Sequence, residues 1–323
     1  YANDTSGNEN TTLAPVNYSI NSLPIINSLL LNTTDLTSNS TNQNLTANVS
    51  STDADSDPVK HIYNWLVNDT AGPGKPFAIL NMPFEKVNGT TTNNAWDYSG
   101  YGNNGSITNE ASNATWSATG GYDGNGTYIF DGTNDFIQIA NEARFDSVSN
   151  LTTMGWVKYD SAGNRHSMLS KTVTAVIADG GWYWDYGGFT AGQVEFCVLG
   201  GNAGGNKYIC AGAAMSEDAW HHIAQVFDSS LSGNDRLKLY IDGAEQSETY
   251  NTAGSFTTIL ANNDPVIIGK TTAFADGTID EVMIFNRSLS NSQIHAIYRN
   301  RTDLISSDET TTGQNWTVDV TPN

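Results

Sequence analysis

The sequence predicts an all-β protein that contains two β-sandwiches, and three observations support this. Beyond residue 76, short runs rich in aromatic and β-branched residues alternate with Gly and Asn turn signals, at a spacing of about eight to twelve residues that is typical of sandwiches and barrels. Helical periodicity is found only in residues 291–300. The segment Gly-Pro-Gly-Lys-Pro at 72–76 marks a boundary with an Asn/Thr/Ser-rich beginning, and a similar composition returns after Arg301.

Four apolar runs are expected to form strands of the first sandwich. Residues 24–31 and 45–49 are the first two runs. Residues 61–67 alternate apolar with polar side chains, as a strand covered on one face does, and Trp65 occupies the position of a buried sandwich tryptophan. Residues 316–320 alternate in the same way near the end of the chain. The tail is therefore expected to rejoin the first sandwich.

The expected domain organisation follows from these runs. We expect an N-terminal strand and linker at 1–22, the first part of one sandwich at 23–75, an inserted sandwich at 76–301, and the final strands of the first sandwich at 302–323. Such an insertion is feasible because the termini of a compact domain usually lie close together.

Composition excludes two classes of partner. The formal net charge is −20, with only 14 Lys and Arg among 323 residues. Binding to nucleic acid needs clustered cations that neutralise phosphates, so no nucleic-acid partner is expected. The chain also contains no apolar run of about 18 residues, so we expect no membrane insertion.

The distribution of N-glycosylation sequons predicts an extracellular or cell-surface protein. Sixteen Asn-x-Ser/Thr sequons occur, and none lies between Leu151 and Phe285. A bulky glycan must point to solvent, so the sequon-free stretch is expected to form core or a contact surface. The candidate N-glycosylation sites include Asn17, Asn32, Asn39, Asn44, Asn48, Asn68, Asn88, Asn104, Asn113, Asn125, Asn150, Asn286, Asn300 and Asn315.

The two cysteines predict one disulfide. Cys197 and Cys210 close a segment of two short β-like runs around a Gly/Asn turn. Residues that face each other across an antiparallel pair can reach disulfide geometry, and an oxidising compartment favours the bond. The alternative is two free, half-buried thiols.

Several ordered segments resemble a known family. The segments are 95–107, 120–139, 151–160, 217–228, 237–246, 265–270 and 277–298. In this order they resemble the laminin G-like (LamG-like) family of concanavalin A-like jelly rolls, over roughly residues 77–300. The resemblance implies a jelly-roll β-sandwich for the inserted domain.

The flanking segments resemble a second family less specifically. Residues 53–69 and 313–323 are similar to strands of the Ig-like repeats of bacterial and archaeal cell-surface proteins. This resemblance implies an Ig-like sandwich whose last strand is missing after Asn323. The N-terminal run reads like that strand, with apolar side chains at alternate positions. These donor-strand residues are Ala14, Val16, Tyr18 and Ile20.

An incomplete sandwich and a spare strand predict assembly. A strand from another copy can complete the sandwich by β-strand addition, and a head-to-tail contact that does not close gives a filament. Alternatives are a tandem array, fold-back of the chain's own strand, and an unrelated flexible tail. The leading hypothesis is a structural subunit of an extracellular filament, sheath or stalk, and other copies of the chain are its partners. The second hypothesis is an adhesin that binds extracellular glycans without polymerising.

No catalytic activity is expected. The paired-carboxylate spacing of glucanases with this fold is absent, and the consecutive residues Asp280 and Glu281 should face opposite sides of a strand. His221 and His222 have no accompanying nucleophile motif, and we interpret His222 as a satisfied core histidine.

A structural Ca²⁺ ion is implied by the jelly-roll resemblance, and by resemblance four residues are its candidate ligands. They are Asp97, Asn104, Asp131 and Asp280, with Asp135 in reserve. Ca²⁺ takes six to eight oxygen ligands, which Gly/Asn loops supply through carbonyls. The alternative for these side chains is the capping of loops by Asx-turns. The acidic segment 53–58 fails the EF-hand pattern and is read as a solvated turn.

The aromatic cluster at 180–189 is the candidate glycan-binding surface, because sugars need exposed aromatic platforms beside polar groups. Its candidate residues are Trp182, Trp184, Asp185 and Tyr186. The alternative is that these side chains complete the core or an intersubunit contact.

Overall fold

The structure is a computed structural model that describes residues 22–34, 40, 42–68, 74–85, 94–107, 114–146, 148–159, 165–174, 177–188, 190–201 and 207–323. The predicted donor strand at 14–20 lies outside these residues, as do the sequons Asn17, Asn39, Asn88 and Asn113.

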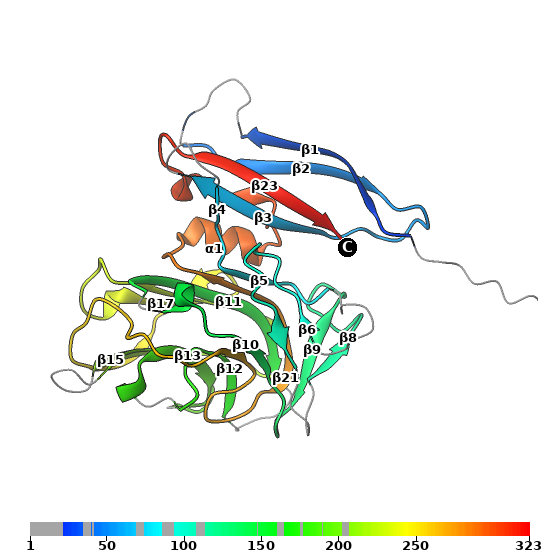
Figure 1. Ribbon diagram of the computed structural model, residues 1–323. Helices are drawn as coiled ribbons and strands as arrows, with labels where there is room; N and C mark the ends of the chain where they lie inside the picture. Colours follow the sequence, from blue (N-terminus) through cyan, green and yellow to red (C-terminus); the bar gives the residue numbers. More distant parts are fainter. Residues whose placement is uncertain are drawn as a thin grey trace, which may run out of the picture.

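The larger body of the molecule is a jelly roll of two antiparallel sheets (Figure 1). We call the first the disulfide sheet, which contains Cys197 and Cys210. Its described strands are, in spatial order, β19 (Thr249–Ala253), β15 (Lys207–Ala214), β14 (Gln193–Gly201), β13 (Gly181–Tyr186), β12 (His166–Ser170), β20 (Val266–Ile268), β10 (Ile137–Ile139), β7 (Gly105–Ser106) and β6 (Asn94–Ala95).

We call the second the junction sheet, because its outer face meets the rest of the chain. Its described strands are, in order, β18 (Ala244–Glu245), β17 (Leu237–Ile241), β16 (His221–Asp228), β11 (Asn150–Tyr159), β21 (Asp276–Phe285), β9 (Thr127–Asp131) and β8 (Thr115–Ser117), with β5 (Leu80–Met82) also paired to β21.

The facing sides of these two sheets enclose the main core. Trp182, Trp184 and Phe196 of the disulfide sheet pack in one buried cluster with Val157 and Phe227 of the junction sheet. All five are fully buried at 0% exposure. Removing this much apolar surface from water is the main stabilising contribution to the jelly roll.

A smaller sandwich lies beside the junction sheet and consists of two further sheets. The β1 sheet contains β1 (Ile25–Thr33), β2 (Leu45–Thr52) and β22 (Leu304–Ile305). The β23 sheet contains β23 (Asn315–Pro322), β3 (His61–Asn68) and β4 (Lys75–Pro76). Together we call them the small sandwich. Each sheet combines strands that precede the jelly roll with one that follows it, so the tail rejoins the first strands as expected.

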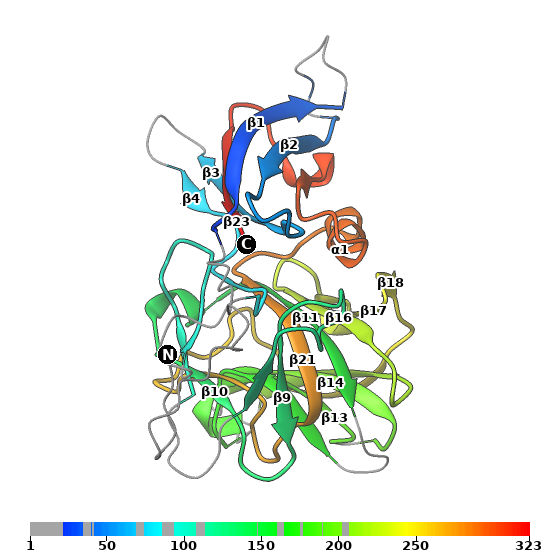
Figure 2. The same cartoon turned by 90° about the vertical axis from the view of Figure 1, so that its right-hand side faces the viewer.

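The small sandwich and the jelly roll share an apolar interface. One buried cluster joins Ala47 and Trp65 of the small sandwich to Met154 and Phe285 on the outer face of the junction sheet. Helix α1 (Asn291–Tyr298) contributes Ile294 to the same cluster and lies beside β18, as Figure 2 shows. Ser290 caps this helix by accepting a hydrogen bond from the N–H of Gln293. Short 3₁₀ turns are η1 (Ala143–Phe145), η2 (Ile177–Asp179), η3 (Gly233–Arg236) and η4 (Ser307–Glu309).

The prediction that Trp65 is buried is confirmed. Trp65 is 5% exposed, and its indole N–H donates to the carbonyl of Thr302 at 2.9 Å. The Asp-Gly pair at 242–243 forms the tight turn between β17 and β18 with φ of +52° and +76°, the conformation that favours this dipeptide in hairpins. Among the described residues, no helix has both the length and the apolar character needed to cross a bilayer.

Candidate interaction sites

The small sandwich is open along one side. Within the described residues, β1 and β23 are edge strands of their two sheets, and they lie on the same side of the sandwich (Figure 1). The groove between them is lined at one end by Leu31, Leu45 and Trp316, with a volume of about 470 Å³. An overlapping hollow of about 500 Å³ extends it towards the loop at 310–314. We call this feature the strand groove.

The strand groove exposes side chains that belong to the inner face of the sandwich. Leu29 pairs with Val49 and lies on the same face as Leu31, which packs against buried Ala47. Leu29 is nevertheless 41% exposed. Long edge strands with apolar side chains and unpaired backbone groups readily accept another strand. The geometry of the strand groove is therefore that of a strand acceptor.

Three sequons on the strands of the small sandwich have side chains that face outwards. Leu31, Ala47 and Trp316 face inwards, so their neighbours Asn32, Asn48 and Asn315 face outwards by strand alternation. Asn48 and Asn315 are exposed. Asn32 and Asn315 also lie at the rim of the strand groove, whereas Asn48 does not line it, so a glycan at Asn48 would leave the groove free.

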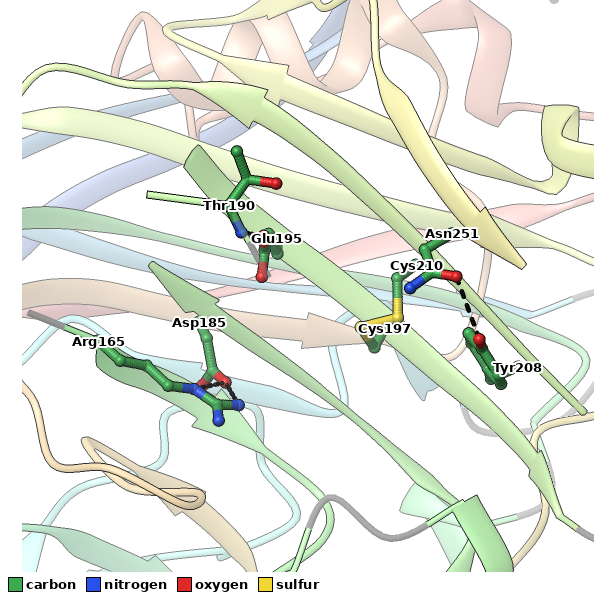
Figure 3. The surroundings of a disulfide bond; sticks show 8 residues. All are labelled: Arg165, Asp185, Thr190, Glu195, Cys197, Tyr208, Cys210 and Asn251. Atoms are coloured by element: carbon green, nitrogen blue, oxygen red, sulfur yellow. Dashed lines mark hydrogen bonds and ion pairs between the residues drawn. A yellow bond between two sulfur atoms is a disulfide. The ribbon is translucent and has the colours of Figure 1, made fainter. Parts of the chain in front are cut away.

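The predicted glycan platform was wrong, because the structure buries it. Trp182, Trp184 and Asp185 are each 0% exposed, and Tyr186 is 2% exposed. The three aromatic residues belong to the main core, as the alternative interpretation held. Asp185, on the other face of β13, receives a hydrogen bond of 2.9 Å from Nε of Arg165 (Figure 3). A buried ring cannot stack on a sugar, so this strand offers no binding surface.

The predicted disulfide is confirmed. Cys197 and Cys210 are directly opposite each other on β14 and β15, and their sulfur atoms are bonded (Figure 3). Both residues are buried on the outer face of the disulfide sheet, with Tyr183 and Leu199 beside them. The bond therefore ties two neighbouring strands of the sheet whose inner face forms the core.

The predicted Ca²⁺ ligands do not converge in the described part of the chain. The carboxylate of Asp97 is saturated by the N–H groups of Asn81, Ser99 and Asn103 and by the Ser99 hydroxyl. Asn104 accepts a hydrogen bond from the N–H of Asp97, and Asp131 accepts from the N–H groups of Thr133 and Asn134. Asp135 in turn accepts from the N–H of Asp131. These contacts are the loop caps of the alternative interpretation, and Ca²⁺ binding stays a prediction.

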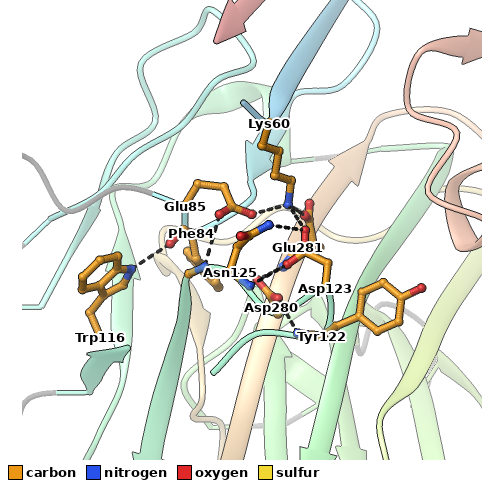
Figure 4. Close-up of polar contacts among 10 residues, drawn as sticks. Lys60, Phe84, Glu85, Trp116, Tyr122, Asp123, Asn125, Asp280 and Glu281 are labelled. Atoms are coloured by element: carbon orange, nitrogen blue, oxygen red, sulfur yellow. Dashed lines mark hydrogen bonds and ion pairs between the residues drawn. The ribbon is translucent and has the colours of Figure 1, made fainter. Parts of the chain in front are cut away.

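A different acidic cluster joins the two bodies of the molecule (Figure 4). Lys60, which precedes β3 of the small sandwich, forms ion pairs with Glu85, Asp123 and Glu281 of the jelly roll. The Lys60–Asp123 contact is 2.7 Å long. Ligand oxygens of the three carboxylates lie within 4.8 Å of one another. The ammonium group of Lys60 thus neutralises carboxylates from three separate segments of the jelly roll.

The cluster changes the ionisation of its members. Burial favours neutral Lys60, but Glu281 and Glu85 outweigh it, so the pKa of Lys60 is raised. Burial raises the pKa of Glu85 and of Glu281, in both cases against the opposing effect of Lys60. Burial alone would raise the pKa of Asp123. The hydrogen bonds from Lys60 and Asn125 outweigh burial, so the pKa of Asp123 is lowered.

Asp280 lies beside this cluster and its charge interacts with Glu281 and Lys60, which corrects the prediction that Asp280 and Glu281 face opposite sides. The register of β11 and β21 shifts between the pairs Trp156–Asp280 and Met154–Met283. Glu281 has a φ of +52° at this bulge, and a bulge redirects side chains. Asp280 accepts a hydrogen bond from the N–H of Tyr122. Burial is the largest cause that raises the pKa of Asp280, and the negative charge of Glu281 is the second.

Sequence reasoning missed Lys60, Glu85 and Asp123. The four residues of the ion-pair cluster come from positions 60, 85, 123 and 281, so no local motif connects them. The available signal was a lone lysine shortly after three aspartates in an acidic chain. In the structure those aspartates form a turn in which Asp53 accepts from the N–H groups of Asp55 and Asp57.

The two histidines differ from expectation. His221 lies in a Ser-His-Asp hydrogen-bond chain, with Nε2 at 2.7 Å from the Ser216 hydroxyl and Nδ1 at 2.8 Å from the Asp242 carboxylate. Ser216 is exposed, and the Asp242 side chain is 37% exposed. Water therefore competes for a contact that triad enzymes keep buried. His222 is buried, but its Nδ1 has no hydrogen-bond partner among the described residues, so it is not fully satisfied.

Comparison with solved structures shows the fold. The botulinum neurotoxin serotype G binding domain matches with a TM-score of 0.50 and 18% identity, over 69% of this chain and 51% of that one. The receptor binding domain of botulinum neurotoxin D matches with a TM-score of 0.50 and 15% identity, over 70% and 53%. The receptor binding domain of the botulinum neurotoxin C/D mosaic serotype matches with a TM-score of 0.50 and 16% identity, over 70% of this chain and 51% of that one. The match spans about half of each of these domains.

Comparison of the sequence identifies the family. None of the curated proteins matches the chain significantly. The model of the concanavalin A-like lectin/glucanases superfamily, of the laminin G type, matches residues 131–295, which is more than half of the chain. These residues run from the end of β9 through most of α1 and contain the described strands that form most of both jelly-roll sheets. The chain therefore belongs to the concanavalin A-like lectin/glucanases superfamily.

Proposed function

We propose that this chain is an extracellular, non-enzymatic protein that assembles head to tail and displays its jelly roll as a binding module. In this proposal the strand groove of one copy accepts residues 14–20 of the next copy as an additional strand beside β23. The resulting contact is heterologous and does not close, so it yields a filament, sheath or stalk.

The observation that carries the proposal is the exposed inner face of the small sandwich. Leu29 faces the interior but is 41% exposed, and both strands that bound the strand groove have unpaired edges within the described residues. Main-chain hydrogen bonds to β23 would supply affinity, and apolar side chains in the strand groove would supply specificity.

The sequence of the donor strand fits this groove. Val16, Tyr18 and Ile20 alternate with Asn17 and Ser19, so one face of an extended strand is apolar and the other polar. Asn17 is a sequon. With the apolar face inserted, its glycan points to solvent, as does a glycan at Asn48 on β2.

Two observations support the display of a binding module outside the cell. The Cys197–Cys210 disulfide suits an oxidising compartment. The jelly-roll fold is shared with binding domains of neurotoxins. A lectin-like adhesin that remains monomeric is the competing function.

Deletion of residues 1–21 tests the assembly directly. We expect the full chain to form ordered fibres in electron microscopy and the deletion variant to remain monomeric, with unchanged circular dichroism. A synthetic peptide of residues 10–22 should bind the deletion variant one to one. Fibres from the deletion variant would rule the proposal out, as would a full-length monomer that excludes the peptide because its own strand folds back.

A pair of point variants sharpens this test. Tyr18→Asp places a charge on the apolar face of the donor strand and should abolish peptide binding. Ser19→Asp places the same charge on the outward face and should change binding by less than about threefold. Equal effects of the two variants would contradict the proposed orientation.

A further inference from the structure

A second pocket, of about 510 Å³, lies between helix α1 and the start of β2. It shares no lining residue with the strand groove. His295, Arg299 and Arg301 line it, and no lining residue in the described part of the chain is acidic. Its remaining polar lining consists of Asn44, Ser292, Ser306 and Ser307.

The charge of this pocket is unusual for the molecule. The chain has 14 Lys and Arg against 34 Asp and Glu, yet two arginines converge here. His295 and Arg299 are one turn apart and therefore lie on the same side of α1. Arginine near a helix C-terminus also stabilises the helix dipole. That effect accounts for Arg299 and does not account for Arg301, which lies beyond the end of the helix.

The arginines retain hydrogen-bonding capacity. Arg301 uses Nε and Nη2 to hold Asp303, at 2.8 and 3.0 Å, which fixes its orientation and leaves Nη1 for another acceptor. Arg299 is exposed and forms no ion pair within the described residues. A fixed and a free guanidinium together can hold a carboxylate or sulfate group.

We propose that this pocket binds an acidic saccharide unit, one that carries a carboxylate or a sulfate. The guanidinium groups of Arg299 and Arg301 hold the anionic group. The hydroxyls of Ser292 and Ser307 meet the hydroxyls of the sugar. Ala296 and Leu304 supply an apolar wall for the C–H face of the ring. The volume lies within the range of small-ligand pockets. The site does not depend on head-to-tail assembly.

The chain's own glycan is the competing occupant. Asn44 lines the pocket and is a sequon, and Asn300 is a sequon next to Arg299. The side chain of Asn44 is held in place because its Oδ1 accepts a hydrogen bond from the N–H of Ser307 at 2.8 Å. The variant Asn44→Gln removes this sequon and separates the two possibilities.

Calorimetric titration of the full chain tests the proposal. The probes are tri-galacturonic acid, which carries only carboxylates, a heparin-derived tetrasaccharide, which also carries sulfates, and maltotriose as the neutral control. We expect at least one acidic probe to bind and maltotriose not to bind. Arg299→Ala and Arg301→Ala should each weaken binding by tenfold or more, and added salt should weaken it further.

A matched control excludes a general charge effect. Lys238→Ala removes a cation from the exposed pair Lys238–Glu245 on β17 and β18, and it should leave binding unchanged. The proposal is overturned if no acidic probe binds, if maltotriose binds equally well, or if Lys238→Ala weakens binding as much as Arg299→Ala. Binding that appears only in Asn44→Gln would assign the pocket to the chain's own glycan and would also overturn it.

Discussion

The jelly roll and the small sandwich bury their inner faces to very different degrees. Trp184 and Phe227, which face the interior of the jelly roll, are both 0% exposed. Leu29, which faces the interior of the small sandwich, is 41% exposed. Both bodies are built from antiparallel strands, so the difference lies in completeness. The jelly roll has two sheets that cover each other, whereas no described strand covers the small sandwich beside β1 and β23.

This difference indicates that the two bodies reach stability by different routes. The jelly roll satisfies its own core, and its outer junction face is covered by α1 and the small sandwich. The small sandwich depends on that shared interface and, in our proposal, on a strand from another copy. Substitutions in the core of the jelly roll should therefore lower its stability, whereas substitutions in the strand groove should mainly affect binding.

Truncation of one core residue in each body gives the largest expected contrast. Trp184→Ala should lower the free energy of unfolding by about 3–5 kcal/mol, because it leaves a cavity in a closed core. Leu29→Ala should cost less than about 1 kcal/mol in the monomer, since its site is already partly solvated. Urea denaturation of the deletion variant lacking residues 1–21 measures both. Similar losses for the two substitutions would contradict the comparison.

The outer face of the junction sheet should respond to acid through His222, which packs against Trp156 and against Tyr298 of α1. Burial lowers the pKa of His222 from 6.5 to about 4, against the opposing effect of Asp242. Because the unfolded chain binds the proton first, stability is full above pH 6.5 and falls as the pH drops towards 4, by up to about 3 kcal/mol.

Thermal unfolding between pH 7 and 4 checks this expectation. The variant His222→Gln should show a smaller loss of stability over the same range, whereas His295→Gln, which changes an exposed histidine, should not. An unchanged pH profile in His222→Gln would show that other groups cause the loss.

Removal of Lys60 tests how much the ion-pair cluster contributes to joining the two bodies. Lys60→Met should lower the free energy of unfolding by about 2 kcal/mol. This is less than the loss expected for breaking a fully buried ion pair, because the Lys60 side chain remains 19% exposed. Adding Glu281→Gln should recover part of the loss by removing one uncompensated charge. Lys238→Met, which breaks an exposed pair, should cost less than about 0.5 kcal/mol. Chemical denaturation of the three variants compares these values, and equal losses would contradict the role of Lys60.

The smallest expected effect concerns Ser216. Its hydrogen bond to His221 resembles that of a serine nucleophile, but the exposed Asp242 and the open loop favour a structural role. We expect no covalent labelling of the full chain by a fluorophosphonate probe, monitored by mass spectrometry. Labelling that disappears in Ser216→Ala and persists in Ser230→Ala would show an activated serine and would contradict the proposed absence of catalysis.

Features that depend on local sequence were predictable. The Asp-Gly hairpin at 242–243, helix α1 and the facing cysteines each follow from a short segment. The return of the tail to the small sandwich followed from the alternation of residues 316–320, which pair with β3.

Features that depend on packing between distant segments were not predictable. Both faces of β13 are buried, so alternation could not show whether Trp182 and Trp184 face core or solvent. The residue with positive φ in the bulge is Glu281 and not a glycine, so the sequence lacked the glycine that usually indicates a bulge. Lys60 meets its three partners only because two bodies dock, a relation that no local spacing encodes.

The ladder between β3 and β23 has a mechanical consequence. Residues 61–68 pair along their whole length with residues 315–322, and the jelly roll is inserted between these two strands in sequence. In a filament joined at β23, tension passes through this ladder in shear and leaves the inserted domain outside the line of force. The displayed module would then keep its shape while the fibre is stretched.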